Sequence, residues 1–141
     1  MAAFNKFNLT VEDWLIGRTN YSGDTFKVML SNTAPASASH VYSDISGNEV
    51  ASGGGYTSGG QAITISSVSN SVGLETIVAA ASSPTWTGSG TGFGPFRYVV
   101  VYDSSATTKS LQAWFDYGSS ISVNSGDTFT ITFGANFFTL Q

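Results

Sequence analysis

The amino-acid sequence predicts an all-β protein, an antiparallel β-sandwich or jelly roll with one short N-terminal helix. Aromatic residues make up 13% of the chain, and 16 glycines lie among many serines and threonines, a mixture typical of β-sheets joined by irregular loops. Hydrophobic residues reach 41% while charged residues stay at 10%, as in a folded protein. A chain of 141 residues fits one hydrophobic core, so residues 1–141 are expected to form a single domain.

The helix is expected close to the N-terminus. Thr10 is followed three residues later by Asp13, an acidic variant of the capping box, and the apolar triplet at 14–16 overlaps the next turn. Gly17 stands where a helix commonly ends. The pattern therefore predicts a short amphipathic helix that stops at Gly17.

The first long strand is predicted at residues 25–30 (TFKVML). Phe26, Val28 and Leu30 fall on one face, which is expected to lie in the core, and Met29 falls on the other. Residues 31–60 then form a long loop with one helical turn near residues 44–50, and such loops tend to be functional. This loop is the first candidate for contact with a partner, and a flexible Gly/Ser insertion is the alternative. Its apolar residues available for packing are Val41, Tyr42, Ile45, Val50 and Tyr56.

Further short strands separated by turn residues favour a sandwich, jelly roll or small barrel. No helical crossovers alternate with them, so a parallel sheet is not expected. The predicted strands lie in QAITIS (61–66), ETIVAA (75–80), PTWT (84–87), FGPFRYVVVYDSS (93–105), SLQAWFDY (110–117), DTFTITF (127–133) and the aromatic tail NFFTL (136–140).

Arg97 and Asp116 lie in two of these strands, which are predicted to form a hairpin. If Phe96, Tyr98, Val100 and Tyr102 form the core face, opposed by Leu111, Ala113, Phe115 and Tyr117, paired residue numbers must sum to an odd value, and a turn centred in SSATTK gives 213. This register places Arg97 opposite Asp116 as a cross-strand ion pair on the outer face. It also places Asp103 about 20 Å from Asp116, too far for two carboxylates to share one substrate bond.

No catalytic, cofactor-binding or metal-binding residues are assigned, and the chain is not expected to be an enzyme. The run GSGTGFGP lacks the phosphate-loop spacing and precedes a strand instead of a helix. His40 is the only histidine, and it is expected to be an exposed loop residue without neighbouring carboxylates. Trp14, Trp86 and Trp114 are candidate sugar-stacking platforms, for which core packing is the alternative.

Charge and cysteine content narrow the possible partners. Five Lys and Arg against nine Asp and Glu give a net charge of −4, which disfavours nucleic-acid binding. There is no cysteine, so disulfides and thiolate metal sites are excluded. Neither a signal peptide nor a membrane span is expected, because no apolar run has the necessary length. Synthesis and retention in the cytosol are therefore expected, unless the protein leaves by lysis.

In order, the elements DTFKVML, YSDISGNEV, GYTSGG, PTWT, GPFRYVVVYD and LQAWFDYGSSISVNSGDTFTITF resemble a family of small structural proteins encoded by tailed bacteriophages. The resemblance covers about residues 4–140 and includes no catalytic residue. Proteins of this family are similar to capsid decoration, or cement, proteins, which are β-sandwich or jelly-roll modules on the outside of the phage head. A tail or fibre component that binds carbohydrate is the alternative.

The resemblance implies a location on the outer surface of the virion head. Its expected partners are the major capsid protein and copies of the chain itself, in a dimer or trimer, without nucleic acid, membrane or cofactor. Such a protein binds the assembled capsid and stabilises it by mass action. The loop at 31–60 and exposed strand edges are the expected contact elements, with NFFTL at an oligomer interface.

Overall fold

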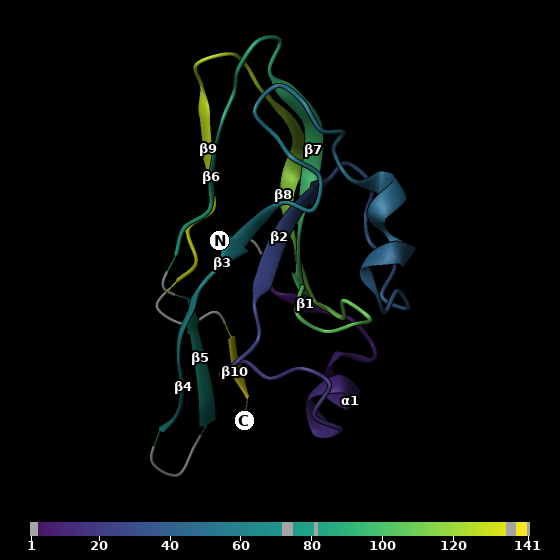
Figure 1. Ribbon diagram of the computed structural model, residues 1–141, viewed down its shortest axis with the longest axis vertical. Coiled ribbons are helices and arrows are strands. Elements are labelled where there is room, and N and C mark those ends of the chain that lie inside the picture. The colour runs from purple at the N-terminus through teal and green to yellow at the C-terminus, as the bar shows by residue number, and fades with distance from the viewer. Residues whose placement is uncertain (1–2, 72–74, 81, 135–137, 141) are drawn as a thin grey trace.

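The computed structural model describes residues 3–71, 75–80, 82–134 and 138–140. Its largest element is a five-stranded antiparallel sheet with the order β1-β8-β7-β2-β3 (Figure 1). The predicted mostly β, antiparallel architecture is therefore confirmed, and no closed barrel is present in these residues. The five strands are β1 (Asn5–Lys6), β2 (Phe26–Ser31), β3 (Gln61–Ile63), β7 (Phe93–Asp103) and β8 (Leu111–Val123).

Two smaller sheets complete the described structure. One pairs β6 (Thr85–Thr87) with β9 (Thr128–Thr130), and it lies over one face of the large sheet (Figure 1). The other has the order β10-β5-β4. Its strands are β4 (Ile65–Ser71), β5 (Glu75–Ala80) and β10 (Phe138–Leu140), which lies in the predicted tail strand.

The large sheet is buried on both faces. Phe26, Val28 and Leu30 pack on one face against Trp86, and the partly buried Phe129 extends this cluster from β9. A second cluster lies on the opposite face, beneath the segment at 31–60 (Figure 1). The buried members of the second cluster are Phe7, Met29, Ile45, Val100, Tyr102 and Leu111. The expectation that β2 has only one face in the core is therefore wrong for Met29, which is fully buried.

The segment at 31–60 is ordered and packed, as its apolar residues suggested. Two short 3₁₀ helices, η1 (Tyr42–Asp44) and η2 (Ser46–Asn48), form the predicted helical turn. Ile45 between them enters the second cluster, and Tyr56 enters the first. The carboxylate of Glu49 accepts hydrogen bonds from the hydroxyls of Tyr42 and Tyr56 and from the backbone N–H of Gly59.

The β7–β8 hairpin exists, but its register differs from the predicted one. Tyr102 pairs with Leu111 as expected, whereas Val101 rather than Val100 pairs with Ala113. Irregularities between Val101 and Tyr102 and again near Phe96 shift the pairing. Between Val101 and Tyr102 the extra residue is Gln112 in β8, so β7 keeps its alternation there, whereas near Phe96 the alternation along β7 is broken.

This shift changes which side chains form the core face. Val99 and Val101 join Phe96 in the first cluster, while Val100 and Tyr102 lie in the second. Tyr98 contacts Trp114, which packs against the second cluster, so Tyr98, Val100 and Tyr102 share one face as predicted and only Phe96 lies on the other. Because β7 is buried on both faces, hydrophobicity alone does not distinguish them.

The N-terminal helix α1 (Thr10–Leu15) is present and ends before Gly17, whose φ of 72° suits glycine. The predicted capping box is not formed. Leu9 occupies the N-cap position without a side-chain cap, and Thr10 is the first helical residue. The hydroxyl of Thr10 instead donates to the backbone of β8.

Candidate functional site

The buried side of α1 is polar. Thr10 and Asp13 are both fully buried, although hydrophobic residues usually occupy the inner face of a surface helix. The hydroxyl of Thr10 lies 3.2 Å from the carbonyl oxygens of both Leu111 and Gln112, to which it donates. Polar bonds to β8 therefore help fix α1 in place.

Asp13 connects α1 to the loop that follows β2. Its Oδ1 accepts a hydrogen bond from Arg18 at 2.6 Å, and its Oδ2 lies 2.9 Å from Nε2 of His40. His40 is therefore not the isolated, exposed loop residue that the sequence predicted. The chain fold brings Asp13 and His40 together from 27 positions apart, which residue spacing could not show.

Gln112 is the third anchor and is fully buried in β8. Its side-chain oxygen accepts hydrogen bonds from the indole N–H of Trp14 at 2.9 Å and the hydroxyl of Tyr21 at 2.7 Å. Its side-chain nitrogen donates to Thr19 and to the carbonyl of Ser110. Every hydrogen-bonding position needed by this buried amide is thus used, and the segment around α1 is held to the sheet.

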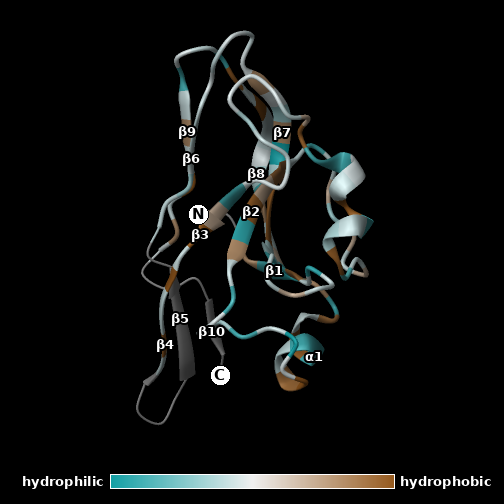
Figure 2. Cartoon of the chain, viewed as in Figure 1, coloured by the Kyte–Doolittle hydropathy of each residue, from teal (hydrophilic) through white to brown (hydrophobic). Residues whose placement is uncertain are grey.

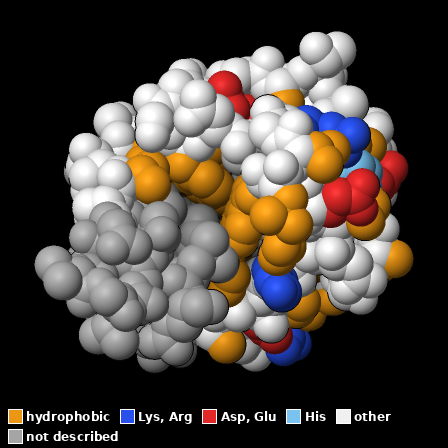
Figure 3. All heavy atoms as spheres, turned by 90° about the horizontal axis from the view of Figure 1, so that it is seen from below, with side chains coloured by type: hydrophobic (Ala, Val, Ile, Leu, Met, Phe, Trp, Pro, Cys, Tyr) orange, Lys and Arg blue, Asp and Glu red, His pale blue; other side chains and the backbone are white. Residues whose placement is uncertain are grey.

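The solvent-facing side of α1 is apolar. At 100° per residue, Leu15 and Glu12 lie opposite Thr10 and Asp13, and the N-cap Leu9 and the C-cap Ile16 flank the helix at its two ends. Leu15 is 82% exposed and Ile16 is 58% exposed. Figure 2 shows hydrophobic residues at the outer end of α1, and Figure 3 shows hydrophobic side chains beside charged ones on the face seen from below.

We name Leu9, Glu12, Leu15 and Ile16 the α1 surface. Its polarity is reversed relative to an ordinary surface helix, since the buried side is polar and the exposed side is apolar. This surface offers apolar contact beside one carboxylate, Glu12, and carries no nucleophile or acid-base pair.

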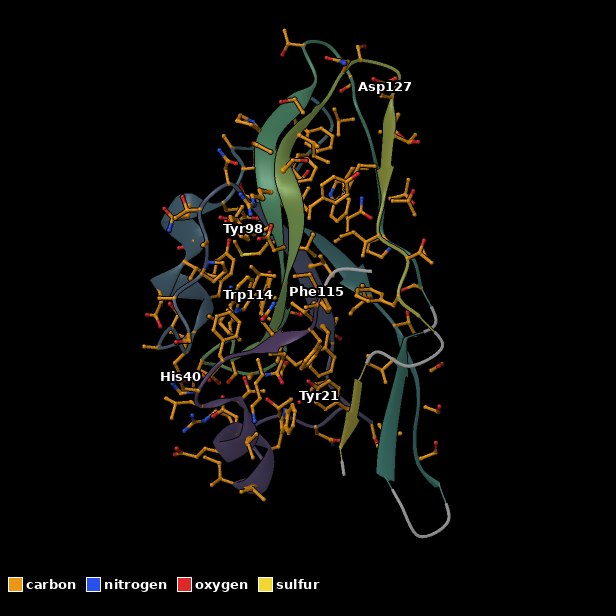
Figure 4. All side chains as sticks on the ribbon, turned by 180° about the vertical axis from the view of Figure 1, so that it is seen from behind. Tyr21, His40, Tyr98, Trp114, Phe115 and Asp127 are labelled. Carbon is orange, nitrogen blue, oxygen red and sulfur yellow. The ribbon has the colours of Figure 1, made fainter. Side chains whose placement is uncertain are left out.

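The three tryptophans are not exposed platforms. Trp86 is buried in the first core cluster, and Trp14 is half-buried with its indole bound to Gln112. Trp114 is also half-buried, and it lies with Tyr98 on the side of the sheet that faces the helical turns, whereas Phe115 faces the other side (Figure 4). The structure gives all three a packing role.

The charges of the hairpin form the predicted ion pair. Arg97 Nε and Nη2 donate to the two carboxylate oxygens of Asp116 at 2.7 and 2.8 Å. Asp116 is directly opposite Tyr98, so the pair is diagonal and was predicted correctly from a wrong register. Arg97 lowers the pKa of Asp116 to about 2, with help from the Gly118 N–H. Asp103 lies five residues along β7 from Tyr98, about 17 Å away, and shares no site with Asp116.

We predict that Asp116→Asn changes the melting temperature only slightly at neutral pH. Both side chains are more than one third exposed, so solvent screens the pair. Because the folded pKa of Asp116 is depressed, the contribution of the pair is present at neutral pH and is lost as pH falls through about 2. Thermal unfolding of the two proteins at pH 7 is the measurement. A loss of cooperative unfolding in the variant would contradict the exposed placement.

The glycine-rich run GSGTGFGP lies in close backbone contact with the loop around Gly54. A shallow groove of about 240 Å³ lies between residues 50–54 and 91–94 and has no charged side chain. A Cβ on Gly54 would lie 1.7 Å from the carbonyl oxygen of Gly92, so these two loops approach too closely for a larger residue. This arrangement is consistent with a wide turn before Pro95.

The described residues contain no group of three metal-ligating side chains. In the same part of the chain, no helix is long and apolar enough to cross a membrane. No family model, curated protein or solved structure matches this chain.

Sequence patterns alone did not reveal the α1 surface. The apolar triplet at 14–16 predicted a buried helix face, yet only Trp14 turns inward. The signal that was present is the polar pair Thr10 and Asp13, spaced three residues apart on one helical face together with Trp14. Gln112 carried no signal, because a single glutamine in an apolar strand looks like an outward-facing residue.

Proposed function

We propose that the protein is a non-enzymatic bacteriophage capsid decoration protein that docks on the outside of the assembled head through the α1 surface. The observation that supports it is the reversed polarity of α1, where a polar anchor holds exposed Leu15 and Ile16. The sequence resemblance supplies the class of partner, the major capsid protein. Contacts with copies of the same chain, in a dimer or trimer, belong to the same proposal.

The finer fold assignment also belongs to this proposal. The β6–β9 pair lies over one face of the large sheet with Trp86 and Phe129 between them, an arrangement that favours a variant of the β-sandwich or jelly roll. Acidic net charge agrees with a protein that faces away from packaged DNA. Docking to the shell but not to free subunits stabilises the assembled state by mass action.

We predict that Leu15→Gln combined with Ile16→Gln weakens binding to intact heads. Full burial of one such side chain is worth about 2 kcal/mol, so loss of both reduces the affinity by about 100-fold or more. Glutamine retains helix propensity, and both positions face solvent, so the melting temperature should remain unchanged. Cosedimentation of purified protein with purified heads measures the binding.

The matched control is Val68→Gln, which changes an exposed apolar residue on β4, away from α1. This variant should cosediment like the unmodified protein. Equal binding by the α1 double variant would refute docking through α1, and absence of the protein from purified virions would refute the decoration role. Binding to a glycan array that is lost on changing an exposed aromatic such as Tyr117 would instead support the carbohydrate-binding alternative.

A further inference from the structure

Asp103, at the end of β7, is a fully buried carboxylate with one unsatisfied oxygen. Its Oδ1 accepts hydrogen bonds from the backbone N–H groups of Ser105 at 2.9 Å and Ala106 at 3.2 Å. Its Oδ2 is equally buried, and no donor from the described residues reaches it. A buried oxygen of this kind is unfavourable when ionised, and a bound proton converts it into a donor that needs an acceptor.

Asp24 supplies that acceptor. Asp103 pairs directly with Phe26 in the β2–β7 ladder, which makes Asp24, two residues before Phe26, its diagonal neighbour on the same face. The side chain of Asp24 raises the pKa of Asp103 both as a hydrogen-bonding neighbour and as a like charge. One oxygen of Asp24 also accepts the backbone N–H of Asn20 at 2.6 Å, which fixes its position.

Backbone contacts hold this pair in place. The N–H of Thr25 donates to the hydroxyl of Ser105 at 2.6 Å. The carbonyl of Thr25 accepts hydrogen bonds from the backbone N–H and the hydroxyl of Ser104 at 2.8 and 2.7 Å. The residues next to each carboxylate are thus joined, so the two carboxylates cannot separate without breaking other hydrogen bonds.

We propose that Asp24 and Asp103 share one proton, which closes a clasp between the segment before β2 and the turn that joins β7 to β8. With the proton bound, Asp103 donates from Oδ2 to Asp24. When the proton leaves, two negative charges face each other and the clasp opens. This inference does not depend on the proposed capsid function.

No cation among the described residues pairs with Asp24 or Asp103. Among the described residues, neither carboxylate forms an ion pair, because the salt bridges there involve Asp13 and Asp116. Lys109, the cation of the turn, lies over the ring of Tyr42 instead. Tyr21, which packs on the Asp24 side, stays neutral because burial raises its pKa well above the usual range.

Burial, followed by the contact with Asp24, raises the pKa of Asp103 to about 6, against the opposing effect of the two backbone N–H groups. A carboxyl group with a raised folded pKa favours the folded state when it is protonated. Its contribution to stability is therefore complete below the unfolded value of 3.8 and is lost as pH rises through about 6.

The test compares the unmodified protein with Asp103→Asn. The asparagine keeps an oxygen for the Ser105 and Ala106 N–H groups and carries a permanent N–H donor toward Asp24, so its clasp stays closed at every pH. We expect similar stability of the two proteins near pH 4. Near pH 7.5 we expect an unfolding equilibrium constant about 50-fold smaller in the variant, because the pKa of Asp103 rises from 3.8 to about 6 on folding. Asp127→Asn, which removes an exposed carboxylate, should follow the unmodified protein at both pH values.

Carboxyl ¹³C NMR provides the direct measurement, with an expected Asp103 midpoint near 6. Titration of Asp103 below pH 4.5 would overturn the proposal, as would a stability difference between the two proteins that does not change with pH. Addition of millimolar calcium chloride at pH 7.5 distinguishes a shared proton from a bound metal cation. If calcium raises the melting temperature of the unmodified protein but not that of Asp103→Asn, the pair holds a cation and the shared-proton proposal is wrong.

Discussion

Replacing Gln112 by leucine will lower the free energy of unfolding by about 3 kcal/mol. Leucine has nearly the same size, so the loss arises from hydrogen bonds and not from a cavity. The indole N–H of Trp14 and the hydroxyl of Tyr21 lose their acceptor, and the carbonyl of Ser110 loses a donor. Several groups with little access to water lose a hydrogen-bond partner at once, which is why the expected effect exceeds that of one ordinary hydrogen bond.

Urea unfolding monitored by tryptophan fluorescence measures this loss, and amide hydrogen exchange in α1 should accelerate in the same variant. Gln61→Leu is the matched control. Gln61 also uses both ends of its amide, toward the backbone of Thr85, but that site is exposed, so the cost should be about 1 kcal/mol. Equal effects at the two positions would show that Gln112 does not organise a buried network.

Glu49→Ala is expected to destabilise the protein by about 3 kcal/mol, because the segment at 31–60 that covers the second cluster loses the hydrogen bonds that hold it in place. The carboxylate accepts hydrogen bonds from Tyr42, Tyr56 and Gly59, which join the helical turn η1 to the last part of the segment at 31–60. Tyr56 is buried, so its hydroxyl cannot turn to water when Glu49 is removed. Urea unfolding gives the stability difference.

The matched control for this position is Glu49→Gln, which keeps one acceptor oxygen and should lose only about 1 kcal/mol. An alkaline absorbance titration adds a local measurement. Burial, and then the bond to Glu49, raises the pKa of both Tyr42 and Tyr56, so tyrosine ionisation should begin at lower pH in Glu49→Ala. An unchanged titration curve would mean that the two hydroxyls do not depend on Glu49.

Much of the fold was predictable because it depends on local patterns. The strand at Phe26, the hairpin on either side of the SSATTK turn and the stop at Gly17 all follow from alternation and turn chemistry. The exact register was not predictable. Its irregularities are set by packing on both faces of β7, and a strand that is apolar on both faces carries no alternation from which to place a bulge.

The candidate site was much less predictable. His40 and Asp13 meet only because the loop after β2 returns to α1, and Asp24 meets Asp103 only through the β2–β7 pairing. Buried polar groups lie where the tertiary structure provides partners, and local sequence contains no record of those partners. Exposure of Leu15 and Ile16 follows from the same cause, because polar residues already occupy the inner side of the helix.

The anchoring of α1 to β8 also has a consequence for biosynthesis. Thr10 and Trp14 find their partners at Leu111 and Gln112, about one hundred residues later in the chain. A nascent chain cannot fix α1 in its final place until β8 has left the ribosome. Chains that end before β8 therefore lack an ordered α1 surface.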